Sequence, residues 1–487
     1  MGTGPGLACL EGMPRLTPVL LLVSALVHAG DLKLSSIFSD HAVLQSGEAN
    51  IYGKAKPGAS VEVAFGSAKV AVTAGADGVF KATLTGQPSE EGKDLVVKSN
   101  GETHVARDVI VGEVWVGSGQ SNMEWVVRNT LNAAEARARP VDNGLRVFTV
   151  NRTPKAEPAE DVQGSWKVAG PTTVDGFTAA GYYFAVALRA ELKQPVGIIH
   201  TSIGGTRAEA WGPRGMYDDV PEAKGWQAKE DKVVADRAAA WEKSGKKDGK
   251  VTPVWSNGPH MNWNGMVAPL VGYSFKGALW YQGESNAGQA AAYKWVLGSM
   301  IKSWHKAWGK EFPFIIVQLP RFMAKKPQPV EEGWAAIRES MEWIADHVPG
   351  AMMTVNIDLG EEKDIHPKDK LPIGERLAAV ALQRVYKTRA VGESPRVVKA
   401  ELQGDAWVVT YDRAFAIKGE GKGWAVQKAD GSWAYASVKA DGAKLTVSAA
   451  DVKAPKAARY AWANFPEVSV FSAGSDGLPA GPWRSDK

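Results

Sequence analysis

A serine lies where a predicted strand turns into a predicted helix. The run from Ile110 to Val116 is mostly apolar and favours a buried strand, and a glycine-bearing turn leads from it to Ser121. Residues 122–138 carry an apolar stripe at helical spacing. Unpaired N–H groups at a helix start can stabilise an oxyanion beside such a hydroxyl. Ser121 is therefore a candidate nucleophile, with a simple N-cap as the alternative interpretation.

A histidine with a nearby carboxylate follows another predicted strand. The loop after residues 352–357 contains Asp364 and His366, and the chain has only 8 His. A general base needs an imidazole whose second nitrogen has an acceptor, which holds the tautomer and stabilises the imidazolium. Asp364 can supply that acceptor. A lone histidine in a loop is more often a surface residue, so the neighbouring carboxylate is what makes His366 a candidate base.

Paired glycines follow the predicted strand 195–201. Gly204 and Gly205 have no side chains, so their backbone N–H groups can approach a ligand closely. Thr206 and Glu209 have the spacing of a capping box, which predicts a helix directly after the glycines. The alternative is a tight turn without a binding role.

The predicted strand 277–281 runs into a dense group of polar residues. Gln282, Glu284 and Asn286 follow it directly, and such groups are costly at the end of a buried strand unless they have partners or a task. Asn286 could donate to an oxyanion, and Gln282 or Glu284 could orient another side chain. Loop capping is the alternative interpretation.

Metal and phosphate sites are not favoured by the sequence. The His are scattered, and neither His-x-x-His nor cysteine pairs occur. Glycine-rich phosphate-binding loops are absent as well. We therefore expect neither a metal nor a cofactor.

The predicted elements indicate an α/β protein with a small β-domain on each side. Apolar β-runs alternate with amphipathic helical stretches over residues 109–395, which favours a mostly parallel sheet covered on both faces. Residues 30–108 and 396–487 read as short β-runs between turn signals and predict antiparallel β-domains. Residues 223–250 predict a helical excursion rather than a linker. The predicted buried strands are 110–116, 195–201, 277–281, 314–319 and 352–357.

Composition narrows the class of protein. A chain of 487 residues has room for about three domains. Hydrophobic residues make up 45% and charged residues 23%, as in soluble globular proteins. The net charge of +4 is too small and too evenly spread to indicate a nucleic-acid partner. The oligomeric state stays open.

Residues 1–29 have the pattern of a signal peptide. Arg15 supplies the positive charge, residues 16–26 the apolar run, and Ala29 ends a small-residue cleavage site. No later run is long enough to span a membrane. The pattern predicts a mature protein that is exported, periplasmic or secreted, and not held in a membrane. The only cysteine, Cys9, lies in the removed segment, so the mature chain has no disulfide.

The motifs together resemble the sialate O-acetylesterase family, part of the SGNH group of serine hydrolases. The resemblance extends over nearly the whole mature chain and rests on Gly119-Gln120-Ser121-Asn122-Met123, Gly204-Gly205-Thr206, Gln282-Gly283-Glu284-Ser285-Asn286 and Asp364-Ile365-His366-Pro367. It implies an SGNH-hydrolase-like three-layer αβα domain between the two β-domains.

The resemblance also implies roles for the residues of these motifs. Ser121 would be the nucleophile and His366 its base, with the N–H groups of Ser121 and Gly205 and the amide of Asn286 as oxyanion donors. Gln120 and Gln282 would orient side chains or contact the substrate. Many SGNH enzymes place the Asp three residues before the His, whereas Asp364 is two before it. Asp364 is the first choice for orienting His366, and Glu284 the second.

The expected function is removal of O-acetyl groups from sugars by a secreted serine esterase, most simply a sialate O-acetylesterase. Deacetylation of xylan or another polysaccharide would use the same site. A non-catalytic carbohydrate-binding protein is the alternative from another class, because the chain has 19 Trp and two β-domains. The natural sugar and the acetyl position stay open.

Overall fold

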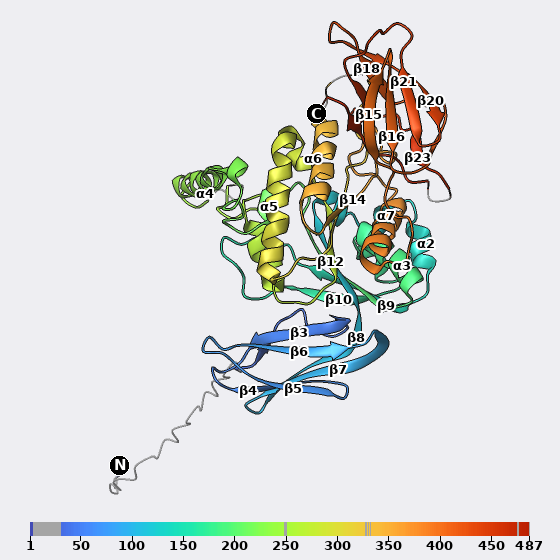
Figure 1. Cartoon of the computed structure of the whole chain (residues 1–487). Coiled ribbons are helices and arrows are strands. Elements are labelled where there is room, and N and C mark those ends of the chain that lie inside the picture. The colour runs from blue at the N-terminus through green and yellow to red at the C-terminus, as the bar shows by residue number, and fades with distance from the viewer. Residues whose placement is uncertain are drawn as a thin grey trace.

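The computed structural model describes residues 1–2, 31–247, 251–326, 329, 331, 333–474 and 477–486. Three units follow one another along the molecule, with an α/β unit between two β-units (Figure 1). The predicted signal peptide, apart from residues 1–2, and Cys9 lie outside the described residues.

The N-terminal unit is built from short strands with an alternating pattern of burial. In β4 the side chains of Val61 and Val63 are buried while Ser60 is exposed, so one face of the strand packs inward. The pairs β1–β3, β3–β6, β4–β5 and β4–β7 are antiparallel. The strands are β1 (Lys33–Leu34), β2 (Val43–Gln45), β3 (Gly47–Lys54), β4 (Ser60–Phe65), β5 (Ala68–Thr73), β6 (Val79–Gly86) and β7 (Ser89–Ser99).

The long strand β8 (Glu102–Gly119) joins the N-terminal unit to the α/β unit. Its first part pairs antiparallel with β7, and its last part pairs parallel with β11 and β12. The strand runs through the predicted boundary between residues 108 and 109. The two units therefore share one continuous strand and one sheet of 11 strands.

The α/β part of this sheet has the strand order β10-β9-β11-β8-β12-β13-β14. Neighbouring strands from β9 to β14 pair in parallel, while β10 pairs antiparallel with β9. With the N-terminal strands included, the sheet is mixed. The predicted strand 277–281 is confirmed with the same bounds. The strands are β9 (Asp142–Val150), β10 (Gly164–Ala169), β11 (Val196–Ser202), β12 (Gly277–Tyr281), β13 (Phe314–Val317) and β14 (Ala351–Thr354).

Helices flank this sheet in two pairs. Helix α3 packs against α7, and α5 packs against α6, on either side of the central strands in Figure 1. Gly374 of α7 lets the first pair come close, because a Cβ there would lie 2.5 Å from Cβ of Tyr183. The helices are α1 (Ser121–Glu124), α2 (Ala133–Ala138), α3 (Ala179–Leu192), α4 (Trp226–Lys243), α5 (Ala290–Trp308), α6 (Gly333–His347) and α7 (Leu371–Ala381). Short 3-10 or π turns are η1 (Val127–Asn129), η2 (Val174–Gly176), η3 (Ala208–Trp211), η4 (Pro221–Ala223), η5 (Trp263–Val267), η6 (Ala268–Leu270), η7 (Glu284–Gln289) and η8 (Leu382–Tyr386).

The prediction of one helix over residues 122–138 is wrong. Helix α1 ends at Glu124, and the chain becomes extended at Val126, which forms a bridge with Thr178. The carbonyl of Trp125 accepts a hydrogen bond from the N–H of Ala179, so backbone groups that a longer helix would use bind the start of α3 instead. Tertiary hydrogen bonds here override the local helical pattern.

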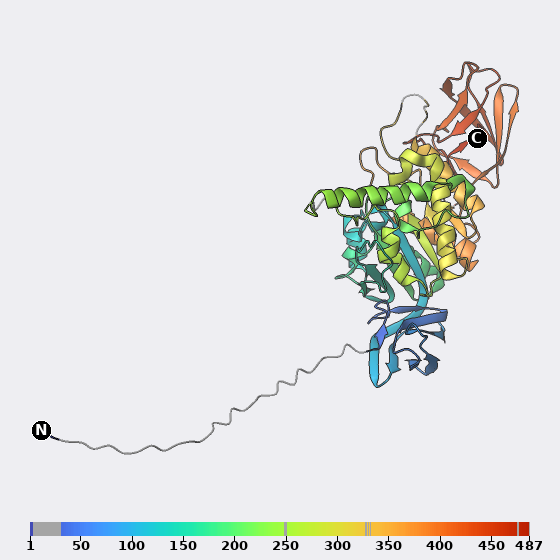
Figure 2. The same ribbon diagram turned by 90° about the vertical axis from the view of Figure 1, so that its left-hand side faces the viewer.

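The prediction of a helical excursion in residues 223–250 is confirmed by α4. None of its residues is buried, and it lies across the outside of the α/β unit (Figure 2). No helix among the described residues is long and apolar enough to cross a membrane.

The C-terminal unit contains three antiparallel sheets, β15-β16-β21-β20, β19-β18-β22-β24 and β17-β23. Its core includes Trp424 and Tyr460, and it also takes in Val355 and Ile357, which follow β14 of the α/β unit. The chain that leads to the His366 loop is thus anchored in this core. The strands are β15 (Val397–Gln403), β16 (Ala406–Tyr411), β17 (Phe415–Ile417), β18 (Trp424–Gln427), β19 (Trp433–Tyr435), β20 (Ser437–Asp441), β21 (Lys444–Ser448), β22 (Ala458–Tyr460), β23 (Val470–Ser472) and β24 (Trp483–Arg484).

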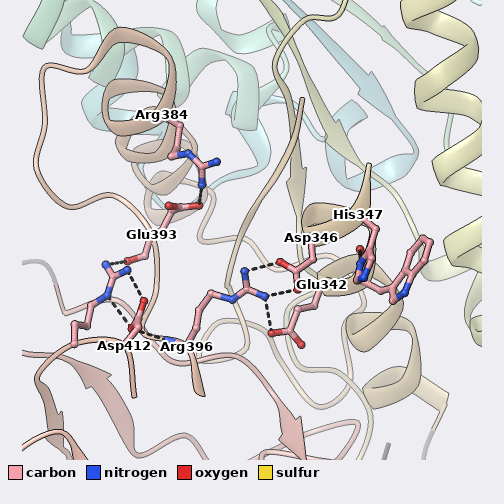
Figure 3. Close-up of polar contacts among 9 residues, drawn as sticks. Glu342, Asp346, His347, Arg384, Glu393, Arg396 and Asp412 are labelled. Carbon is pink, nitrogen blue, oxygen red and sulfur yellow. Dashed lines mark hydrogen bonds and ion pairs between the residues drawn. The ribbon is translucent and has the colours of Figure 1, made fainter. Parts of the chain in front are cut away.

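Arginines join α6 to the C-terminal unit. Arg396, just before β15, binds Asp346 at 2.6 Å and Glu342 at 3.3 Å (Figure 3). Arg338 is fully buried and donates to backbone carbonyls on both sides of the joint, including Leu319 at 2.8 Å and Ala463 at 2.8 Å. Water and salt weaken the exposed ion pairs of Arg396, whereas the buried hydrogen bonds of Arg338 are not weakened in this way.

Replacing Arg338 with Met should destabilise the protein by about 3 kcal/mol, because carbonyls that it now satisfies would stay buried without donors. The matched variant Arg396→Gln should cost less than about 1 kcal/mol, since its ion pairs are half-exposed. Urea denaturation followed by tryptophan fluorescence measures both. Equal losses for the two variants would contradict the role assigned to Arg338.

Candidate active site

Ser121 and His366 meet at the carboxyl ends of the central strands. The Nε2 atom of His366 lies 2.9 Å from Oγ of Ser121. Strand register explains the location, because Gly119 at the end of β8 is aligned with Ser202 of β11 and Tyr281 of β12. Three strand ends therefore meet beside the first turn of α1, where ligands of such sheets bind.

Asp364 lies beside the imidazole of His366. Its Oδ1 atom is 3.7 Å from Nδ1 and accepts a hydrogen bond of 2.9 Å from the backbone N–H of His366. The distance to Nδ1 is that of an ion pair, longer than a hydrogen bond. Trp125 stacks on the imidazole with 5.1 Å between ring centroids and 15° between planes, which fixes the plane of the ring.

The surroundings of His366 favour its neutral form. Burial lowers the pKa of His366 below its usual value, and the positive charge of Lys370 lowers it further. The negative charge of Asp364 acts in the opposite direction and raises this pKa. A neutral imidazole beside a serine hydroxyl can accept its proton.

The backbone at Gly205 is open toward solvent space. Gly205 has φ +73, and a Cβ built on it would meet nothing within 4 Å. Gly204 lies against Ser121, since a Cβ at residue 204 would be 3.3 Å from that of Ser121, and its N–H donates to Glu124 at 2.8 Å. Within the described part of the chain, the N–H groups of Ser121 and Gly205 have no protein acceptor. Both stay available to an oxyanion.

The prediction of a capping box and a helix after the glycines is wrong. The segment forms only the short turn η3, and the Thr206 hydroxyl bonds to the carbonyl of Ile203 and accepts from the indole of Trp211. The carboxylate of Glu209 reaches across to Asn286, and among the described residues no contact joins it to the backbone N–H of Thr206. The side chains have better partners in the fold than in a local cap.

Asn286 is held in a buried amide network. Its Nδ2 donates to Glu209 at 2.9 Å, and its Oδ1 accepts from Gln282 at 2.7 Å and from the N–H of Ala208 at 3.1 Å. Gln282 also donates to Oε1 of Gln120 at 3.1 Å. Burial raises the pKa of Glu209. The network fixes the orientation of the Asn286 amide and leaves its second N–H for another acceptor.

Glu284, the second choice for orienting His366, lies elsewhere. Its Oε1 accepts a hydrogen bond of 2.6 Å from Asn122, and among the described residues no contact joins it to His366. Burial raises the pKa of Glu284. The structure brings Asp364, and not Glu284, to the imidazole.

Two residues that sequence reasoning missed connect these segments. Asn122 donates to Glu284 and to the carbonyl of Ile365 at 3.0 Å, and its Oδ1 accepts from Nζ of Lys370 at 2.5 Å. Lys370 is fully buried, and burial lowers its pKa to about 7. The position of Asn122 next to Ser121 was a usable signal. Lys370 gave none, because it lies in a charged stretch that reads as solvent-exposed.

Metal ligands are not grouped in the part of the chain that the structure describes, where no three His, Cys, Asp or Glu side chains could hold one ion together. The polar groups around Ser121 are instead a base, its carboxylate neighbour and N–H donors. That set suits acyl transfer through a serine.

Comparisons with known proteins give the same class of chemistry. Residues 251–383 match the family model described as carbohydrate esterase, sialic acid-specific acetylesterase. Sialate O-acetylesterase from Mus musculus is 27% identical over 450 residues, which cover 82% of this chain and 83% of the mouse protein. The human enzyme is 27% identical over 413 residues, covering 76% of this chain and 74% of the human protein.

A solved structure is similar over almost the whole chain. It is that of a carbohydrate acetylesterase from Xanthomonas citri, with a TM-score of 0.82 and 30% identity, covering 93% of this chain and 99% of the other. The chain therefore belongs to the sialate O-acetylesterase family, and it is a carboxylic ester hydrolase that acts as a carbohydrate acetylesterase.

Proposed function

We propose that this enzyme removes O-acetyl groups from sialic acids through a Ser121–His366–Asp364 mechanism of the SGNH type. The observation that carries the proposal is the 2.9 Å contact between Nε2 of His366 and Oγ of Ser121. A serine and a neutral imidazole at hydrogen-bond distance, with a carboxylate on the far side of the ring, are the parts of an activated nucleophile.

The reaction begins with attack on the acetyl carbonyl. His366 takes the proton of Ser121, whose oxygen bonds to the carbonyl carbon and forms a tetrahedral oxyanion. The N–H groups of Ser121 and Gly205 and the free N–H of Asn286 donate to that oxygen. The intermediate then expels the sugar alkoxide, which takes the proton from His366, and leaves an acetyl-enzyme.

Hydrolysis of the acetyl-enzyme repeats these steps with water. His366 accepts a proton from water, the hydroxide adds to the acetyl carbon, and collapse releases acetate while Ser121 recovers its proton. Asp364 stabilises the imidazolium that forms in each half of the reaction. The sugar itself stays intact.

Other observations support the proposed substrate and compartment. The relatives named sialate O-acetylesterase cover most of this chain, and they support sialic acid as the sugar. The charged and apolar pattern of residues 1–29 supports export to the periplasm or outside the cell.

Replacing Ser121 with Ala should lower kcat/KM on an aryl acetate by about 10⁴-fold or more, because the nucleophile is lost. The matched control is Ser202→Ala. Ser202 also contacts a histidine, at 2.6 Å from Nε2 of His200, but both side chains are buried. The control should keep its activity within about tenfold. Wild-type rates for Ser121→Ala would exclude Ser121 as the nucleophile.

Asp364→Asn should lower kcat and move the acid limb of the kcat/KM profile to lower pH. The base works in its neutral form, and removing the carboxylate takes away a charge that raises the pKa of His366. Glu284→Gln should leave the acid limb in place, since Glu284 contacts Asn122 and not the imidazole. Steady-state kinetics over pH 4–9 checks both. A shift in Glu284→Gln alone would reverse the assignment.

Acetate release should be faster from O-acetylated sialic acid than from acetylated xylan when both are compared at equal acetyl concentration. The reason is that discrimination between sugars depends on how the site contacts the part of the substrate that does not react. Enzyme-coupled detection of acetate measures both rates. A higher kcat/KM on xylan would replace the sialate proposal with a polysaccharide acetylesterase and leave the mechanism standing.

A further inference from the structure

A cavity lies next to the candidate active site. It has a volume of about 560 Å³ and is bounded by α4, the segment around Trp255 and the start of α5. Arg207 on its wall is two residues after Gly205, and Glu209 on its wall is the residue that binds the Asn286 amide at 2.9 Å. We call it the α4 cavity. Its volume is in the range of ordinary small-ligand pockets.

Aromatic side chains form one part of its lining. Fully buried tryptophans such as Trp280 and Trp304 belong to the core. Trp226 and Trp255, in contrast, are only partly buried and line this cavity. Trp226 packs edge-on against Tyr217 with 5.7 Å between centroids, and the guanidinium of Arg237 lies 4.5 Å from the ring centre of Trp255. Both rings are fixed in place before any ligand binds, and indoles suit the apolar faces of sugar rings.

The wall of the cavity carries two cations and two carboxylates. Among the described residues, the Arg207 guanidinium and the Lys229 ammonium of this wall have no ion-pair partner. The two carboxylates of the wall have partners within the protein, since Glu230 accepts from Tyr217 at 2.6 Å and lies 3.1 Å from Nε2 of His260, and Glu209 accepts from Asn286. Arg207 and Lys229 are therefore the charged groups of this wall that are left to pair with a carboxylate of a ligand.

We propose that the α4 cavity is the sugar-binding subsite of this enzyme and takes an acidic sugar. Trp226 and Trp255 stack against the ring, and Arg207 pairs with its carboxylate. The ester carbonyl then lies on the other side of the Glu209–Asn286 contact, at Ser121. The inference rests on the proposed function for its substrate, but binding of the sugar can be measured without turnover.

Trp255→Ala tests the stacking, with Trp241→Ala as its control. Trp241 is a tryptophan of α4, the helix that borders the cavity, but it does not line the cavity. Trp255→Ala should raise KM for O-acetylated sialic acid about tenfold and leave 4-nitrophenyl acetate hydrolysis within about twofold, because the aryl ester needs no sugar contacts. Trp241→Ala should change neither. An unchanged KM, or equal losses on both substrates, would overturn the subsite.

Arg207→Gln tests the charge and decides the matter if Trp255→Ala does not fold. It should weaken hydrolysis of O-acetylated sialic acid and leave an acetylated neutral sugar unaffected. Equal effects on the two sugars would overturn the pairing of Arg207 with a carboxylate.

Binding separates this inference from the proposed function. Calorimetry of free sialic acid with the Ser121→Ala protein should show binding. Adding Trp255→Ala to this protein should abolish the binding, and adding Trp241→Ala should keep it. If binding behaves so while the wild-type enzyme releases no acetate from O-acetylated sialic acid, the proposed function fails and the subsite stands. If free sialic acid does not bind to the Ser121→Ala protein, the subsite is contradicted.

Discussion

The contact between Ser121 and His366 joins residues 245 positions apart in the chain, so nothing local holds it. One side depends on the register that aligns the end of β8 with β11 and β12. The other depends on a loop whose approach, through Val355 and Ile357, is anchored in the core of the C-terminal unit. The α/β unit and the C-terminal unit thus both contribute to this distance, and the C-terminal unit does more than flank the site.

Asn122 is the link that fixes the two sides against each other. Its amide binds Glu284 at the end of β12, Ile365 in the histidine loop and Lys370 after that loop. Burial disfavours the charged form of an ionisable group. It lowers the pKa of Lys370 to about 7 and raises the pKa of Glu284. Such fixed polar groups give catalysis its preorganised geometry.

The sequence predicted which residues lie together better than it predicted their local structure. Ser121, His366 and Asp364 were recognisable because unusual polar groups follow buried strands, and parallel strands bring those ends together. The β12 segment 277–281 was recognisable because a short apolar run between turn signals has few other uses. Both features depend on which residues are buried and on the direction of the strands. The order of apolar and polar residues in the sequence indicates both.

Features that depend on distant partners were not predictable. The apolar stripe of residues 122–138 did not reveal that Trp125 and Val126 bind the start of α3, which ends the helix at Glu124. The spacing of Thr206 and Glu209 fitted a cap, yet Glu209 binds Asn286, 77 positions away. Lys370 looked exposed and is buried. In each case a tertiary contact decides, and no local pattern encodes it.

The most direct test of the account is the chemical identity of the activated residue. A fluorophosphonate reacts with a serine only where a base activates it, and mass spectrometry of the digested protein locates the label. The account predicts a single phosphonylated peptide, the one that contains Ser121, and loss of labelling in His366→Ala. A label on another serine, or undiminished labelling of Ser121 without His366, would contradict it.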